Sequence, residues 1–434
     1  MPIVPETLRG RTARFSEQRW LLDAVINLIG PEWDQGRLHY WSEPCSPDHA
    51  PAILGLKASI KKYDDMSREL IRAARRFELR AGEGLDAGHP ITASDDLFAA
   101  AILYGGAQWP IFENTPLNLA LEKKKAECYA GYARLADHKV EPVEIPYRGR
   151  SLAAYFHLPP GHGGGPLPCL MMISGMDGTK EMSLSASADR FLRRGFACLC
   201  LDVPGQGTSL TREIWYDPET FGEVGTAAYD WLAARPEVDA GKIMATGVSF
   251  GSYWATQAVV AEPRYAACAV TFTCFHPGAT PLFETASPTF KQRFMYMTGS
   301  NDEAALDALA PKIDVRRLSK DVKIPYLVVA GEDDELSDIG HTFEHLNHVA
   351  GPKTLLLYAG DLHGLAHASS SQLGPPGYSY MADWLRDRAD GKALESEYLL
   401  VDPQGQVHRS PWGEQRTYEY GAPMDLQRLL GDDR

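Results

Sequence analysis

The chain has 434 residues, of which 44% are hydrophobic and 23% are charged, and its formal net charge is −14. A chain of this size can bury a large core, and its negative charge disfavours binding to nucleic acid or to an anionic membrane surface. No apolar run approaches the roughly 18 residues that span a bilayer, and the N-terminus lacks the apolar core of a secretory signal, so we expect a cytoplasmic protein.

Residues 1–137 predict a helical unit without a convincing strand. Apolar residues recur at helical spacing in four segments, at 21–30, 60–79, 94–109 and 117–136. The third segment is expected to begin at Ser94, which can cap a helix with two acids in its first turn. Four amphipathic helices need an apolar partner surface, so we expect this unit to form a cap domain over the rest of the chain.

The hydrophobic period changes to two near residue 138. Two alternating segments flank the turn "YRGR" (147–150), which predicts a hairpin. Six apolar runs then alternate with helical segments: "CLMMISG", "FACLCLDVPG", "KIMATGVS", "CAVTFTCF", "PYLVVAGEDDE" and "TLLLYAGDLHG". This rhythm predicts an α/β domain with a mostly parallel, doubly covered sheet over residues 138–393. We expect residues 394–434 to form an irregular, partly stranded tail that packs on this core.

The seven cysteines predict thiols rather than disulfides. Their number is odd, and no C-x-x-C pair occurs. Five lie inside apolar, strand-like runs: Cys169, Cys198, Cys200, Cys268 and Cys274. We therefore expect reduced thiols that serve as small buried hydrophobes.

The sequence "GVSFG" (247–251) predicts a nucleophilic serine on a sharp turn. Ser249 lies where an apolar strand meets a helical run, and a glycine stands two residues away on each side. A tight turn from strand to helix strains the serine backbone, and side chains at the glycine positions would collide with the adjoining elements. The glycine spacing therefore has a structural cause.

An acid and a base follow in the order that such a site requires. Asp334 comes after the apolar run "IPYLVVAG", and His363 comes after "TLLLYAG". The carboxyl ends of the strands in an open α/β sheet border one crevice, so we expect Ser249, Asp334 and His363 to converge there, with Asp334 preferred to Asp333.

The expected roles follow from general chemistry. His363 would take the proton of Ser249, and Asp334 would fix the tautomer of His363 and stabilise its charged form. An oxyanion needs two donors. We expect them to be the backbone N–H of Phe250 and the backbone N–H of Met176 in "SGMDG".

The chain resembles the α/β-hydrolases that include 2,6-dihydroxypseudooxynicotine hydrolase and the fungal hydrolases that shorten polyketides in melanin formation. The resemblance rests on the motifs "SGMDGTKE" (174–181), "DVPGQG" (202–207), "GVSFGSYWA" (247–255), "EPRYAACAV" (262–270), "GEDDE" and "GDLHG". It implies an α/β-hydrolase fold with an N-terminal helical cap over the active site. It also implies cleavage of a carbon–carbon bond beside a ketone, and a substrate-binding role for Glu284 in "PLFET" (281–285). The longer tail and the loop "CFHPGATPLFET" depart from the group, so the substrate itself is not carried over.

We therefore expect a serine hydrolase that cleaves a carbon–carbon bond adjacent to a ketone in an aromatic or polyketide-like small molecule. A carboxylesterase or an acyltransferase acting on a small-molecule ester would use the same residues. A non-catalytic ligand-binding member of the fold is a further alternative, although it would be expected to lose the nucleophile or the base.

No cofactor or metal is expected. The segment "HTFEH" (341–345) matches a zinc-peptidase pattern, but we identify no third carboxylate for it, and a solvated helix face explains it. The expected partner is a small-molecule substrate, without nucleic acid or membrane, and a homodimer is left open.

Overall fold

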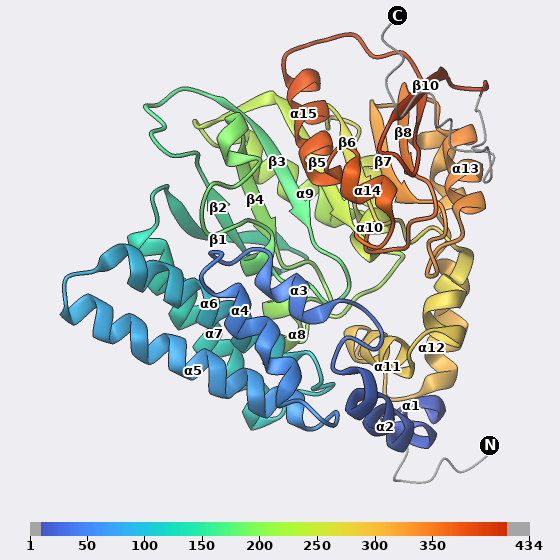
Figure 1. Cartoon of the computed structure of the whole chain (residues 1–434). Coiled ribbons are helices and arrows are strands. Elements are labelled where there is room, and N and C mark those ends of the chain that lie inside the picture. The colour runs from blue at the N-terminus through green and yellow to red at the C-terminus, as the bar shows by residue number, and fades with distance from the viewer. Residues whose placement is uncertain (1–9, 415–434) are drawn as a thin grey trace, which may run out of the picture.

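The computed structural model describes residues 10–414, which are built around one ten-stranded sheet. The strands are β1 (Val140–Tyr147), β2 (Arg150–His157), β3 (Leu167–Ile173), β4 (Ala197–Leu201), β5 (Val238–Val248), β6 (Cys268–Thr271), β7 (Tyr326–Gly331), β8 (Lys353–Tyr358), β9 (Glu397–Val401) and β10 (Val407–Pro411). Their order is β1-β2-β4-β3-β5-β6-β7-β8-β9-β10 (Figure 1). All neighbours from β4 to β9 are parallel, which confirms the predicted α/β fold.

Helices fall into an N-terminal group and a group interleaved with the strands. The first group is α1 (Ala13–Glu17), α2 (Arg19–Ile29), α3 (Arg37–Ser42), α4 (Ala50–Leu54), α5 (Asp65–Asp86), α6 (Pro90–Gln108) and α7 (Pro116–Leu135). The second is α8 (Gly207–Thr211), α9 (Glu223–Ala233), α10 (Phe250–Ala261), α11 (Pro288–Met297), α12 (Glu303–Leu309), α13 (Ile339–His348), α14 (Ser369–Leu373) and α15 (Gly377–Ala389). In Figure 1 the first group gathers below the sheet. Within residues 10–414, no helix combines the length and apolar content needed to cross a membrane.

The start of α6 differs from the expectation. The helix begins at Pro90, and Ser94 is buried inside it rather than at its N-cap. Proline has no N–H and its φ is fixed near the helical value, so it fits the first position of a helix. The capping pattern at Ser94 was therefore overridden by a stronger start signal four residues earlier.

Positive backbone angles close the predicted hairpin between β1 and β2. The turn residues Arg148 and Gly149 have φ values of 49° and 74°. Two consecutive positive angles are typical of the turn that matches the twist of a two-residue hairpin. The hairpin predicted around "YRGR" is confirmed by the antiparallel pairing of its strands.

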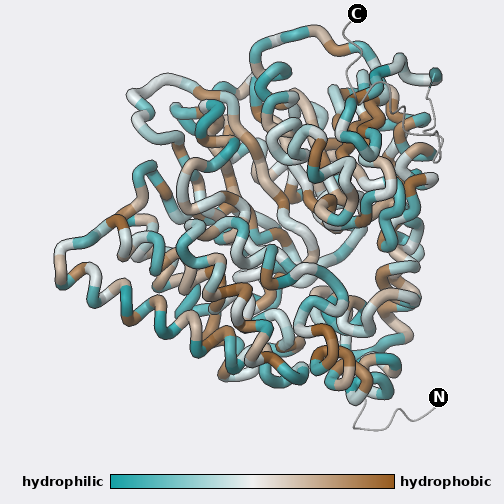
Figure 2. The backbone as a smooth tube through the Cα atoms, viewed as in Figure 1, coloured by the Kyte–Doolittle hydropathy of each residue, from teal (hydrophilic) through white to brown (hydrophobic). Residues whose placement is uncertain are grey.

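The two faces of the sheet pack into separate apolar clusters. Along β7, Val328 belongs to one cluster, whereas Leu327 and Val329 belong to the other, as expected for side chains that alternate across a strand. A third cluster fills the helical unit and includes Tyr155 of β2. In Figure 2 hydrophobic segments lie in the strands, whereas α5 alternates between hydrophilic and hydrophobic segments. The helical unit therefore shares its core with the edge of the sheet.

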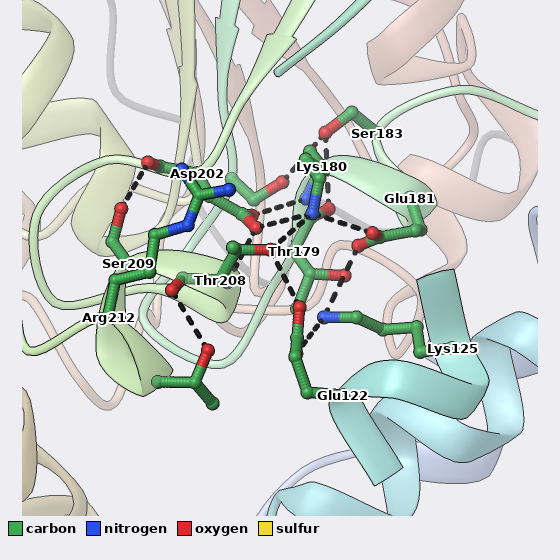
Figure 3. A network of polar contacts seen from close by, with 12 residues as sticks. Glu122, Lys125, Thr179, Lys180, Glu181, Ser183, Asp202, Thr208, Ser209 and Arg212 are labelled. Carbon is green, nitrogen blue, oxygen red and sulfur yellow. Dashed lines mark hydrogen bonds and ion pairs between the residues drawn. The ribbon is translucent and has the colours of Figure 1, made fainter. Parts of the chain in front are cut away.

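A buried network of five charged side chains joins α7 to the domain that contains the sheet (Figure 3). Its members are Glu122, Lys125, Lys180, Glu181 and Asp202, and none is more than 12% exposed. The Lys180 ammonium lies 2.8 Å from Asp202 and 2.7 Å from Glu181, and Lys125 lies 2.8 Å from Glu122. Burial opposes ionisation of Asp202, but the two lysines hold its pKa below the usual value. Separating α7 from the segment that carries Lys180 and Glu181 would leave buried charges without their partners.

The chain after residue 394 adds two strands to the sheet. Strand β9 pairs in parallel with β8, and β10 pairs antiparallel with β9. The rest of the expected tail, residues 415–434, lies outside the described residues.

All seven cysteines are free and buried: Cys45, Cys128, Cys169, Cys198, Cys200, Cys268 and Cys274. Burial raises the pKa of the Cys128 thiol to about 12, and it also raises the pKa of the other six thiols. The expectation of reduced, buried thiols is confirmed.

Candidate active site

Ser249 occupies a strained turn between β5 and α10. Its φ and ψ are 55° and −125°, a conformation that side chains rarely adopt. A Cβ atom on Gly247 would lie 2.1 Å from the carbonyl oxygen of Gly251, and one on Gly251 would lie 2.5 Å from that of Ser174. Both glycines are therefore required by close packing around the turn.

The structure brings Ser249, His363 and Asp334 together. The Ser249 Oγ lies 2.9 Å from the His363 Nε2, and the His363 Nδ1 lies 2.9 Å from the Asp334 Oδ2. Asp334 also accepts the backbone N–H groups of Leu336 and Ser337, which fix its carboxylate. The neighbouring Asp333 is exposed and takes no part in this chain of hydrogen bonds.

The electrostatics of His363 come from opposing effects. Burial favours the neutral imidazole, but the charge and hydrogen bond of Asp334 outweigh it and raise the pKa of His363 above its ordinary value. Glu335 adds a smaller effect in the same direction and accepts the backbone N–H of His363 at 3.0 Å. The imidazole is thus held in one orientation with Nε2 toward Ser249.

A cavity opens beside this group of residues. Ser249, His363, Gly175, Met176 and Asp177 line it from the sheet side. Apolar side chains and residues of the helical unit complete its wall, among them Met172, Leu184, Phe191, Phe272, Leu282, Phe290, Met381, Gln35, Arg37, Tyr40 and Trp41. A small molecule inside would therefore touch Ser249, His363 and the helical unit together.

Two backbone amides near Ser249 have no acceptor in the described part of the chain. Within residues 10–414, neither the N–H of Met176 nor that of Phe250 donates to another protein group. Phe250 is the first residue of α10, where a helix leaves its N–H groups free. Both amides are available to a ligand oxygen.

Glu284 does not line the cavity. It lies in a π-helical turn, Pro281–Thr285, and its half-exposed side chain pairs with Lys291 at 2.9 Å. Leu282 of the same turn lines the cavity instead. The structure therefore does not place Glu284 in the cavity wall, because its turn directs the carboxylate to an ion pair with the buried Lys291.

The residues of "HTFEH" also differ from the expectation. His345 is fully buried and bonds to Ser319 Oγ at 2.8 Å, and burial lowers its pKa to about 3. The solvated helix face predicted there is wrong for this residue. In the part of the chain that the structure describes, no three potential ligands are arranged to hold a metal ion.

Sequence reasoning missed a buried ion cluster in the cavity wall. Arg37 on α3 makes two hydrogen bonds to Asp34, at 2.7 and 2.9 Å, and one to Asp177 at 2.9 Å. Its guanidinium also lies 3.7 Å from the centre of the Trp109 ring. Asp177 belongs to "SGMDG", so Arg37 joins the helical unit to the loop of Met176. No periodicity or motif in the sequence marks this pairing.

The fold and the arrangement of the site define the protein as an α/β-hydrolase. A family model described as FrsA-like esterase matches residues 72–297, and the chain belongs to this family. A model for acetyl xylan esterases matches residues 225–372.

Individual relatives agree with this assignment. The chain is 29% identical over 277 residues to the α/β-hydrolase ucsC of Acremonium sp, covering 58% of this chain and 54% of that protein. It is 27% identical over 266 residues to 2,6-dihydropseudooxynicotine hydrolase of Paenarthrobacter nicotinovorans, covering 61% and 69%. The chain spans about half the length of the first of these curated relatives.

Solved structures show the same fold. The crystal structure of 2,6-dihydroxy-pseudo-oxynicotine hydrolase has a TM-score of 0.69 at 22% identity, covering 83% of this chain and 97% of that one. Wild-type AbyA5 has a TM-score of 0.60 at 20% identity, covering 81% and 98%.

Proposed function

We propose that the protein is a serine hydrolase in which Ser249 attacks a substrate carbonyl. The supporting observation is the continuous chain of hydrogen bonds from Ser249 through His363 to Asp334, which ends on a buried carboxylate. His363 takes the serine proton as the bond to carbon forms, and Asp334 stabilises the resulting imidazolium. The free N–H groups of Met176 and Phe250 receive the negative charge that develops on the carbonyl oxygen.

The reaction that we propose is hydrolysis of a carbon–carbon bond beside a ketone in an aromatic or polyketide-like small molecule. A carbanion leaving group must be delocalised and then protonated at carbon, which favours a site shielded from water. The cavity beside Ser249 is lined mostly by apolar surface, with residues of the helical unit in its wall, and this supports the proposal. We assign residues 1–137 to a cap on the same ground. A similar chain carries the name of a pseudooxynicotine hydrolase, and this adds to the proposal by analogy.

Ester hydrolysis is the second candidate. It is favoured by the esterase descriptions of the two family models that match the chain. Attack by Ser249 and stabilisation of the oxyanion would be the same, and only the leaving group would differ. Acyl transfer to an alcohol in place of water is a variant of this candidate.

The deciding experiment compares kcat/KM for a 1,3-diketone with that for a matched aryl ester, with and without an added alcohol. Preference for the diketone supports carbon–carbon hydrolysis, whereas an ester preference above about a hundredfold rejects it. A change in product ratio with the alcohol would identify acyl transfer. Turnover of either substrate by Ser249→Ala at a rate near that of the wild type would reject the serine mechanism altogether.

A further inference from the structure

The helical wall of the cavity contains a tyrosine hydroxyl that has no hydrogen-bond partner among the residues that the structure describes. Tyr40 on α3 lines the cavity, and its hydroxyl makes no hydrogen bond to any residue between 10 and 414. A methyl group placed on the α-carbon of Gly364 would lie 3.5 Å from the Tyr40 hydroxyl oxygen. Gly364 directly follows His363, so the Tyr40 hydroxyl lies beside the backbone next to His363.

Two sides of Ser249 can be distinguished, one bordered by the loop of Met176 and the other by His363. The loop of Met176 approaches Ser249 at Gly175, where an added methyl group would lie 3.0 Å from the serine Cβ. In the proposed mechanism the oxyanion of the substrate lies on that side, where the Met176 N–H can donate to it. The base of a serine hydrolase returns its proton to the leaving group, which must therefore lie against the imidazole. The Tyr40 hydroxyl lies beside Gly364, the residue after His363, and Tyr40 lines the same cavity as His363.

We propose that the Tyr40 hydroxyl donates a hydrogen bond to the oxygen atom of the leaving fragment. This inference rests on the proposed function and specifies its substrate class: the leaving fragment carries an enolate-type or phenolate-type oxygen. A leaving group without such an oxygen would gain nothing from Tyr40.

The proposed reaction uses the side chains of Ser249, His363 and Tyr40 and one water molecule. The Ser249 oxygen forms a bond to the ketone carbon while His363 takes the serine proton. Collapse of the tetrahedral species breaks the carbon–carbon bond, and its electron pair is delocalised onto the neighbouring carbonyl oxygen, where Tyr40 donates. The proton on His363 then passes to the leaving carbon. Water then attacks the acyl carbon while His363 takes its proton, the bond from carbon to the Ser249 oxygen breaks, and His363 returns the proton to that oxygen as the acid is released.

Two features keep Tyr40 in the donor state and in place. Burial raises its pKa to about 12, against the opposing effect of Arg37, so the hydroxyl keeps its proton at neutral pH. Arg37 lies one turn earlier on α3 and is fixed by its bonds to Asp34 and Asp177. The ring of Tyr40 is thus carried by a helix that is anchored to the loop of Met176.

A second cavity tyrosine offers a matched control. The Tyr378 hydroxyl also has no hydrogen-bond partner among the described residues. Its ring packs against Phe272 at 5.7 Å between centroids, and Phe272 in turn lies 5.9 Å from the His363 ring, so the ring contacts of Tyr378 toward His363 run through Phe272. Removal of this hydroxyl should therefore leave the leaving fragment unaffected.

The experiment measures kcat/KM for Tyr40→Phe, Tyr378→Phe and wild type on p-nitrophenyl acetate, phenyl acetate and a 1,3-diketone. The p-nitrophenolate leaving group carries its own charge well and needs little help. We expect Tyr40→Phe to change its turnover by less than about threefold, and to slow the diketone by about 10²-fold, as for loss of one donor to an oxyanion. Phenyl acetate should fall between the two, and Tyr378→Phe should leave the ratios unchanged.

The outcomes separate this inference from the proposed function. Equal losses on all three substrates, or no loss on phenyl acetate and the diketone, would overturn the role of Tyr40. If the wild type does not cleave the diketone, carbon–carbon hydrolysis fails, and the ratio of the two esters alone decides on Tyr40.

Discussion

The two walls of the cavity are held in place by different means. On the sheet side, Ser249, Asp334 and His363 each follow the end of a parallel strand, and tight turns fix them. On the helical side, α3 has only six residues, which is too short to be stable alone. Buried side chains hold this helix: Leu38 and Trp41 pack in the core of the helical unit, and Arg37 makes buried ion pairs with Asp34 and Asp177. The sheet wall is therefore set by backbone geometry, whereas the helical wall is held by side-chain contacts, among them the buried ion pairs of Arg37.

The largest effect is expected on the sheet side, from a change that alters the chemistry without moving either wall. Ser249→Ala should lower kcat by about 10⁴–10⁶-fold while the fold stays intact, because the serine oxygen forms the covalent bond. Steady-state kinetics and labelling by an organophosphonate measure this, and labelling should vanish in the variant. Retention of a tenth of the wild-type activity in a pure sample would contradict it.

Arg37→Met should break the helical wall and leave the sheet wall in place. The Asp34 carboxylate, 1% exposed, would lose its partner, and breaking a buried pair costs about 3–5 kcal/mol in the free energy of unfolding. Urea denaturation gives this loss. The turn at Ser249 should persist, so slow labelling by an organophosphonate should remain detectable.

The matched control is Arg68→Met on the same helical unit. Arg68 pairs with Asp65 but is 64% exposed, and a surface ion pair contributes at most about 1 kcal/mol. If both variants lost the same free energy of unfolding, the buried ion pairs of Arg37 would contribute no more to the helical wall than a surface ion pair does.

The pH dependence of kcat/KM should follow the titration of His363, which belongs to the sheet side of the cavity. His363 must be neutral to accept the serine proton, and its pKa is raised by Asp334 above the ordinary 6.5. Activity should therefore be lost as the pH falls through a midpoint above 6.5. Profiles recorded on p-nitrophenyl acetate from about pH 5 to about pH 9 test this. A midpoint at or below 6.5 would show that Asp334 does not control the imidazole.

The smallest effect is expected outside both walls, at Glu284. Its partner Lys291 keeps two other acids, Glu303 at 3.0 Å and Asp307 at 2.8 Å. Glu284→Gln should therefore cost less than about 1 kcal/mol of stability and leave kcat/KM within about twofold on ester and diketone. A selective loss on the diketone would return Glu284 to the substrate site and show that the turn rearranges.

The difference between the walls also decides what the sequence could predict. Ser249, Asp334 and His363 were found because each follows an apolar run, and the ends of parallel strands meet at one edge. The glycines around Ser249 were found because close packing excludes side chains there. Both signals are local in the chain, and so they survive without knowledge of the tertiary structure.

The features that were missed depend on contacts between distant segments. Arg37 and Asp177 are 140 residues apart, and neither lies in a periodic pattern that would pair them. Tyr40 is an ordinary residue of a short helix until α3 is placed over Gly364. The errors at Ser94 and His345 have the same origin, because each residue's surroundings are set by the elements packed against it.

The buried cysteines have a practical consequence for measuring the two walls. With every native thiol buried and its pKa raised, thiol-directed dyes should leave the folded wild-type chain unlabelled. A single cysteine introduced at Glu43, an exposed position beside α3 that borders the cavity, would then carry the only dye. Fluorescence from that site would follow the helical wall during turnover without any prior removal of native cysteines.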